Sequence, residues 1–149
     1  MKLKELSYIL FISTITLSSC DGFEISNNGD LDGMWHLVQV DSLRVNCLPQ
    51  DYTNEGIFWS IQDKLMMVED KQDRYQSLFL RFSREGNVFC TSEPYINHHR
   101  EKPEEKTEDV SLLKPYGLNK VNETFQIEKI NSEELILQSD ILSLSFVRY

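Results

Sequence analysis

Two adjacent histidines and several carboxylates lie in one polar stretch of the sequence and have the residue types of metal ligands. They are His98 and His99, followed by Arg100, Glu101, Glu104 and Glu105. A metal site needs three or four ligands that converge from a rigid frame. These residues lie instead in one short charged segment, and such segments are usually solvated. The sequence therefore predicts no metal site.

The common catalytic and cofactor motifs do not occur in this sequence. It has no serine, histidine and aspartate in a recognisable catalytic context, no glycine-rich phosphate loop and no Cys-x-x-Cys pair. His36 is next to Trp35 on an expected strand, so its side chain is expected to face the exterior. We therefore expect neither enzymatic activity nor a cofactor.

A second candidate site is a cavity for a small apolar ligand, lined by large apolar side chains. The candidates are Phe58, Trp59, Met67, Leu80, Phe82 and Phe125. The alternative is that they are plain core, because a small eight-stranded barrel can fill its interior with side chains. The sequence leaves both interpretations open.

Apolar and polar residues alternate along much of the chain, and this pattern is typical of half-buried strands. These strands must position the apolar side chains. Leu78, Leu80 and Phe82, for example, point one way, and Arg81 and Ser83 point the other. The pattern predicts eight strands, over residues 34–40, 57–61, 64–69, 77–84, 88–92, 124–130, 134–139 and 141–149. Eight strands with mostly short turns predict an all-β, up-and-down antiparallel barrel, because closure removes exposed sheet edges. A two-sheet sandwich is the alternative.

One long connection, from Glu93 to Glu123, interrupts this alternation with polar and charged residues and three prolines. Within it, residues 107–113 are predicted to form a short helix with Thr107 as the N-cap. Pro115 would stop this helix, and Gly117 would allow the turn that follows. The short helix therefore lies in the connection between the fifth and sixth predicted strands.

Two cysteines, Cys47 and Cys90, lie 43 positions apart in the predicted barrel. In an oxidising compartment they could form a disulfide across the barrel, which would stabilise the fold by roughly 4 kcal/mol. The alternative is two unpaired thiols, with Cys90 a small core residue. Sequence alone does not supply the Cα distance that decides between them.

The N-terminal residues have the pattern of an exported protein. Lys2 and Lys4 precede an apolar run over residues 8–17, which is too short to span about 30 Å of hydrocarbon. The run ends in Leu17-Ser18-Ser19-Cys20, which resembles a bacterial lipobox. The resemblance implies that residues 1–19 are a signal peptide and that Cys20 carries a lipid. Plain secretory cleavage is the alternative.

Residues 20–31 lack apolar periodicity and are predicted to be a flexible tether, which leaves residues 32–149 as the folded domain. The tether begins Asp21-Gly22-Phe23-Glu24, similar to acidic signals that send some Gram-negative lipoproteins to the cell surface. In enteric bacteria, however, an aspartate directly after the lipidated cysteine signals retention in the inner membrane. We expect a lipid-anchored protein of the cell envelope, on the outer membrane and exposed at the cell surface.

The charge of the chain disfavours polyanionic partners. Removing residues 1–19 takes away Lys2, Lys4 and Glu5, which changes the formal charge from −9 to −10 and leaves 130 of 149 residues. That length suits one domain. So acidic a protein would be repelled by nucleic acid and by anionic lipid headgroups.

Several short motifs resemble lipocalin-like lipoproteins of Gram-negative anaerobes. Gly33-Met34-Trp35 matches the Gly-x-Trp start of the first lipocalin strand. The segments 112–117 and 144–149 also fit that group. In lipocalins the first-strand Trp closes one barrel end and a basic residue near the C-terminus packs on it. The resemblance implies these structural roles for Gly33, Trp35 and Arg148.

Two functions follow from these observations. The first is a membrane-anchored module that binds a small apolar ligand in its barrel. The second is a protein-interaction or accessory subunit with a solid barrel, which acts through the connection from Glu93 to Glu123. The discriminating feature is the interior, because a binding module needs an apolar cavity of several hundred Å³.

Overall fold

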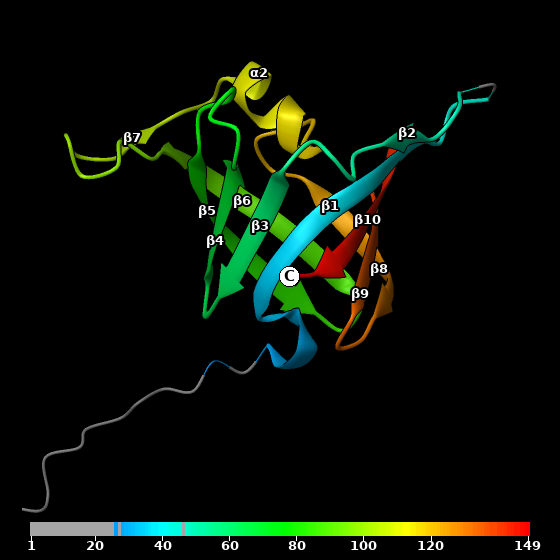
Figure 1. Cartoon of the computed structure of the whole chain (residues 1–149). Coiled ribbons are helices and arrows are strands. Elements are labelled where there is room, and N and C mark those ends of the chain that lie inside the picture. The colour runs from blue at the N-terminus through cyan, green and yellow to red at the C-terminus, as the bar shows by residue number, and fades with distance from the viewer. Residues whose placement is uncertain (1–25, 27, 46) are drawn as a thin grey trace, which may run out of the picture.

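A computed structural model describes residue 26, residues 28–45 and residues 47–149. Eight strands form a closed antiparallel barrel (Figure 1), and two further strands have two residues each. The barrel strands are β1 (Gly33–Ser42), β3 (Ile57–Gln62), β4 (Leu65–Asp70), β5 (Leu78–Glu85), β6 (Val88–Ile96), β8 (Thr124–Ile130), β9 (Glu134–Gln138) and β10 (Leu142–Arg148). The two short strands are β2 (Gln50–Asp51) and β7 (Glu105–Lys106). No helix within the described ranges is long and apolar enough to span a membrane.

Closure comes from the pairing of the last strand with the first. In chain order each barrel strand pairs with the next, and β10 pairs antiparallel with β1 from Trp35↔Arg148 to Ser42↔Leu142. The up-and-down barrel predicted from the alternation is therefore confirmed, and the sandwich alternative is wrong. Closure leaves neither β1 nor β10 as an exposed edge.

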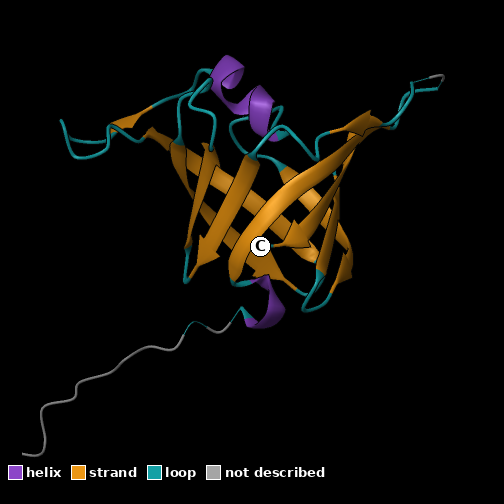
Figure 2. Cartoon of the chain, in the orientation of Figure 1, coloured by secondary structure: helices purple, strands orange, loops and turns teal. Residues whose placement is uncertain are grey.

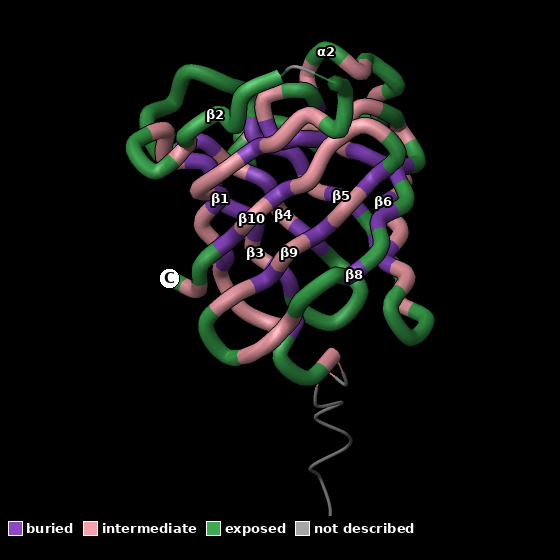
Figure 3. Tube along the Cα trace, turned by 90° about the vertical axis from the view of Figure 1, so that its right-hand side faces the viewer, coloured by how far each residue is buried: buried purple, intermediate pink, exposed green. Residues whose placement is uncertain are grey.

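Buried positions recur along the barrel strands (Figure 3), and buried apolar side chains from all eight strands form one cluster in the interior. Five aromatic rings meet at its centre, from Trp59, Phe82, Phe89, Phe125 and Phe146. The ring centroids of Trp59 and Phe146 are 4.9 Å apart, and those of Phe82 and Phe89 are 5.3 Å apart. These separations are those of rings in contact. The interior is therefore the hydrophobic core.

The connection from Glu93 to Glu123 closes one barrel end (Figure 2) with α2 (Val110–Leu113) and η2 (Lys114–Tyr116). Tyr116 is fully buried there. Its carbonyl accepts a hydrogen bond from Trp59 Nε1 at 3.1 Å, and its hydroxyl donates to the Gln76 carbonyl at 3.0 Å. Burial raises the pKa of the Tyr116 hydroxyl. Part of this connection therefore belongs to the core, and only the rest of it is exposed to solvent.

The helix predicted over residues 107–113 is shorter than expected and has a different N-cap. Asp109 caps it by accepting a hydrogen bond from the Ser111 backbone N–H at 2.9 Å. Thr107 directly follows β7, and its backbone N–H donates to the Pro94 carbonyl. Strand β6 also continues to Ile96, four residues beyond the predicted end, because its last residues pair with both β5 and β7.

The opposite barrel end is closed by η1 (Gly29–Leu31), Trp35 and Arg148. Leu31 and Trp35 are fully buried, and Trp35 Nε1 donates to the Leu31 carbonyl at 2.8 Å. The Arg148 guanidinium lies over the Trp35 ring, 4.2 Å from its centroid. Because Leu31 belongs to the core, the folded part begins before residue 32, the predicted domain boundary.

Gly33 leaves room for this guanidinium. Its φ of +131° is rare for residues with a side chain, and a Cβ there would clash with Arg148 Nη1. The guanidinium donates to the carbonyls of Asp32 at 2.7 Å and Ser132 at 2.6 Å, and also to that of Asp30. The last strand is thus tied to the segment that precedes the first.

Cys47 and Cys90 are both free, so the disulfide considered from the sequence is not formed. Cys47 is exposed in the connection between β1 and β2. Cys90 is half-buried at an outward position of β6, which lies four strands away from β1 around the barrel. The thiols therefore belong to opposite sides of the molecule.

Candidate functional site: a groove on the outer face of the barrel

The two histidines of the polar stretch do not form a metal site. They lie in the connection between β6 and β7, where the nearest carboxylate oxygen to His98 Nε2 is that of Glu105, at 4.0 Å. His99 Nε2 lies 3.4 Å from Ser77 Oγ instead. Within the described ranges, no three His, Cys, Asp or Glu side chains are arranged to hold a metal ion.

Four of the six proposed ligand-binding residues meet inside the barrel. Trp59, Leu80, Phe82 and Phe125 are between 0% and 7% exposed and belong to one buried cluster. They contact other core side chains, so the structure gives them the role of plain core, one of the two interpretations open from the sequence. An interior ligand would have to displace these side chains.

The other two, Phe58 and Met67, lie on the outer face, so their expected place in an interior cavity is wrong. Each is next to a buried inward residue, Trp59 or Met66, and successive residues of a strand face opposite sides. Phe58 is covered on the outside by His36, with ring centroids 4.6 Å apart, and its ring edge meets Tyr149. Partial burial lowers the pKa of His36, because it disfavours the charged imidazolium.

Met67 belongs instead to an apolar row that crosses the outer face. The strand register places Ser60 of β3 opposite Met67 of β4, and Met67 opposite Phe79 of β5. The row continues to Met34 of β1 on one side and to Tyr95 of β6 on the other. Outward positions of a soluble barrel are normally polar, and this row is largely apolar. It therefore has the character of a binding surface rather than of a solvated face.

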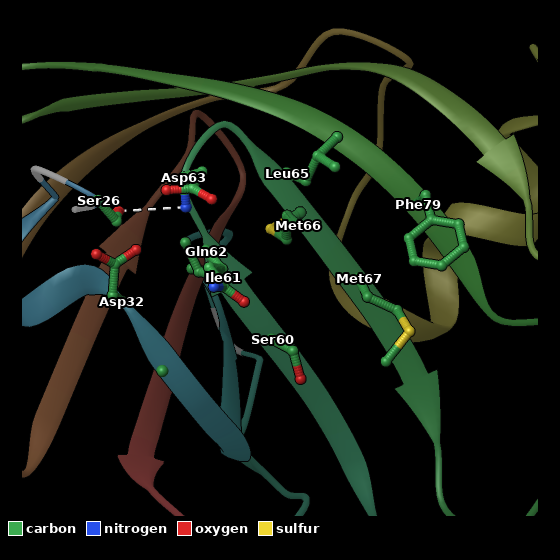
Figure 4. Close-up of a pocket in the computed structure, with 11 residues that line it drawn as sticks. Ser26, Asp32, Ser60, Ile61, Gln62, Asp63, Leu65, Met66, Met67 and Phe79 are labelled. Atoms are coloured by element: carbon green, nitrogen blue, oxygen red, sulfur yellow. Dashed lines mark hydrogen bonds between the residues drawn. The ribbon is translucent and has the colours of Figure 1, made fainter. Parts of the chain in front are cut away.

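A groove of about 730 Å³ includes Ser60, Met67 and Phe79 of this row (Figure 4) and is called the outer-face groove below. Its walls come from the start of β1 and from β3, β4 and β5: Ser26, Asp32, Gly33, Ser60, Ile61, Gln62, Asp63, Leu65, Met66, Met67 and Phe79. The volume lies within the range of small-molecule sites, about 300–1,000 Å³. Leu65, which is 51% exposed, keeps part of the apolar wall accessible to solvent.

The two ends of the outer-face groove differ in chemistry. Met67 and Phe79 lie at one end, and the Asp32 and Asp63 carboxylates lie at the other, beside Ser26 (Figure 4). The Ser26 hydroxyl accepts a hydrogen bond from the Asp63 backbone N–H at 3.2 Å and so fixes the turn between β3 and β4. The groove can bind a ligand whose apolar part contacts Met67 and Phe79 and whose polar group lies at Asp32 and Asp63.

A second hollow of about 360 Å³ shares Leu65 and Phe79 with the outer-face groove and extends toward Tyr95 and Arg81. Sequence reasoning included Met67 but missed the groove and its other apolar residues. The available signal was the pair of runs Leu65-Met66-Met67 and Leu78-Phe79-Leu80, which are apolar on both faces of their strands. Such runs predict that the outward side chain is covered by another part of the protein, by a ligand or by a partner.

The closed eight-stranded up-and-down barrel, plugged at one end by the first-strand Trp and the Arg above it, is that of a lipocalin-like protein. Residues 15–149 match the family model described as the lipocalin-like domain, and the chain belongs to that family. The resemblance noted in the sequence is thereby confirmed. No curated protein matches the chain.

Two solved structures share this fold. A lipocalin-like protein from Bacteroides uniformis aligns with a TM-score of 0.59 and 17% identity, covering 81% of this chain and 100% of its own. An uncharacterized protein from Bacteroides eggerthii aligns with a TM-score of 0.58 and 15% identity, covering 79% of this chain and 98% of its own. At these identities the likeness establishes the fold alone. A lipocalin-like barrel is an architecture suited to a ligand-binding module.

Proposed function

We propose that this protein is a lipid-anchored binding protein of the cell envelope that holds a small apolar ligand in the outer-face groove. The observation that carries the proposal is the apolar wall of Leu65, Met67 and Phe79 around about 730 Å³ on the outer face. The packed interior supports this location over a site inside the barrel. We infer binding rather than catalysis, because the described residues of the groove walls include two carboxylates but no histidine, cysteine or lysine.

A straight-chain alcohol tests the site. Decanol titrated into the mature protein by calorimetry should bind, and Met67→Asp should weaken its binding at least tenfold, because a charge would then face the hydrocarbon. Val147→Asp is the matched control, since Val147 is an outward, 38% exposed residue of β10, three strands away from β4. Equal affinity of the wild type and Met67→Asp for decanol would rule out the outer-face groove.

Lipid anchoring at Cys20 is a separate part of the proposal, and Cys20 lies outside the described residues. Support comes from the lipobox-like Leu17-Ser18-Ser19-Cys20. In the native host, Cys20→Ala should abolish membrane association and leave the precursor unprocessed, as membrane fractionation and mass spectrometry of the protein would show. Cys47→Ala, which also removes one thiol, should change neither. A Cys20→Ala protein that is still processed and membrane-bound would contradict the lipid anchor.

An interaction role is the second candidate. The connection from Glu93 to Glu123, the contact region expected from the sequence, packs in part into the core and leaves residues 99–106 exposed. A different region favours a protein partner, because Val45 and Leu48, beside β2, are 88% and 85% exposed. Co-purification from native membranes should lose the partner on Val45→Ser with Leu48→Ser if this role holds.

A further inference from the structure

We propose that the ligand of the outer-face groove is an amphiphile with one hydrocarbon chain and a protonated amine head. This inference rests on the proposed function, and it adds the chemical class of the ligand. It follows from the charge of the groove walls rather than from their apolar area. The hydrocarbon chain lies along Leu65, Met67 and Phe79, and the amine lies between the carboxylates of Asp32 and Asp63.

The only ionisable side chains among the described residues that line the groove are Asp32 and Asp63. Neither carboxylate forms an ion pair with any described lysine, arginine or histidine. One Asp32 oxygen accepts a hydrogen bond from the Asn28 amide at 2.8 Å, which holds that carboxylate in place without neutralising it. Two carboxylates without a described ion-pair partner thus lie at one end of an apolar groove, and the Arg148 guanidinium binds the backbone carbonyl of Asp32 rather than its carboxylate.

The backbone around the two aspartates is also fixed by hydrogen bonds. Asp63 has a φ of 55°, and its backbone N–H and carbonyl bind Ser26 Oγ and the Asn28 amide, respectively. The carbonyl of Asp32 binds Arg148 at 2.7 Å. The two carboxylates are therefore carried on a backbone that is already ordered, which lowers the entropy lost when a ligand binds.

A protonated amine fits this end of the groove better than other head groups. An ammonium has three hydrogen-bond donors and a positive charge, and this end of the groove offers two carboxylates as acceptors. A carboxylate head would be repelled by Asp32 and Asp63, and a hydroxyl head would gain no charge attraction. The charges of the groove therefore select the head group, and its apolar wall selects the tail.

Three amphiphiles that differ only in the head group test this inference at pH 7 on the mature protein. Decylamine should bind about fivefold more tightly than decanol, the gain that two partly exposed ion pairs supply, and decanoate should bind more weakly than decanol. The preference for decylamine should shrink as salt is added, because salt screens exposed charges. Equal affinities for decylamine and decanol at low salt would overturn the inference.

The double variant Asp32→Asn with Asp63→Asn should bring the affinity for decylamine down to the affinity for decanol measured on the same variant. Asparagine keeps the oxygen that accepts from Asn28 and tolerates the positive φ at position 63, so the fold should persist. Asp73→Asn is the control, because Asp73 is an exposed carboxylate outside the outer-face groove. A preference for decylamine that survives in the double variant would overturn the assignment of the amine to these aspartates.

The possible failures are distinguishable from one another. Decanol binding without a preference for decylamine contradicts the amine head but leaves the proposed apolar-ligand function standing. Failure of all three amphiphiles to bind contradicts both. A groove occupied by a second copy of the chain would give a dimer in analytical ultracentrifugation that decylamine does not dissociate, and this result would overturn the inference as well.

Discussion

Replacing Trp35 with alanine is expected to lower the free energy of unfolding by about 3–5 kcal/mol, the range for emptying a large buried aromatic site. Trp35 is fully buried and closes the barrel end against Leu31. The substitution removes the indole, its hydrogen bond to the Leu31 carbonyl and the ring beneath Arg148. The remaining side chains cannot collapse into the space, because the strand register on both sides is fixed by β3 and β10.

Urea denaturation of the mature protein measures this loss. Trp35→Phe serves as the matched variant, since it keeps an aromatic ring under the guanidinium and removes only the Nε1–H donor and part of the volume. We expect its loss to be clearly smaller than that of Trp35→Ala. A loss below 1 kcal/mol for Trp35→Ala would show that Trp35 does not close the barrel.

Arg148→Ala is expected to cost about 2–4 kcal/mol. The change removes the stacking of the guanidinium on Trp35 and its hydrogen bonds to the carbonyls of Asp30, Asp32 and Ser132. Arg148→Lys should also destabilise the domain, although it keeps the charge, because an ammonium lacks the planar fork that reaches several acceptors and stacks on a ring. Urea denaturation compares the variants, and Arg100→Lys in the exposed hairpin is the control.

A double-mutant cycle isolates the contact between the two residues. The loss caused by Arg148→Lys should shrink when Trp35 is already leucine, because the ring that the guanidinium stacks on is then absent. Losses that simply add would show that Arg148 stabilises the barrel only through the backbone carbonyls that it binds.

The strands were predictable because alternation is a local signal. Residues such as Leu78, Leu80 and Phe82 show it within one segment, and the count of eight strands then led to a closed barrel. The contact between Arg148 and Trp35 was expected instead from the resemblance to lipocalins, in which a basic residue near the C-terminus packs on the first-strand Trp. The strand pattern itself needed no information about distant parts of the chain.

The outer-face groove and the places of Phe58 and Met67 were not predictable in this way. Phe58 is flanked by Ile57 and Trp59, and Met67 follows Met66, so alternation does not decide which residue faces inward. The groove also depends on cross-strand register, which brings Met67 opposite Phe79. The later start of the helix depends on the pairing of β7 with β6, which brings residues 105–106 back alongside residues 95–96.

The pairing of β10 with β1 has a consequence for how the protein folds. Arg148 binds Asp32, 116 residues earlier, and the β1–β10 ladder is the seam that closes the barrel. Contacts between residues so far apart in sequence require a large loop to close first, so folding should be slow for a domain of this size. Until β10 has left the ribosome, β1 and β9 each have one unpaired edge. The nascent chain therefore carries two strands that can pair with a neighbouring chain, and only the emergence of β10 ends that exposure.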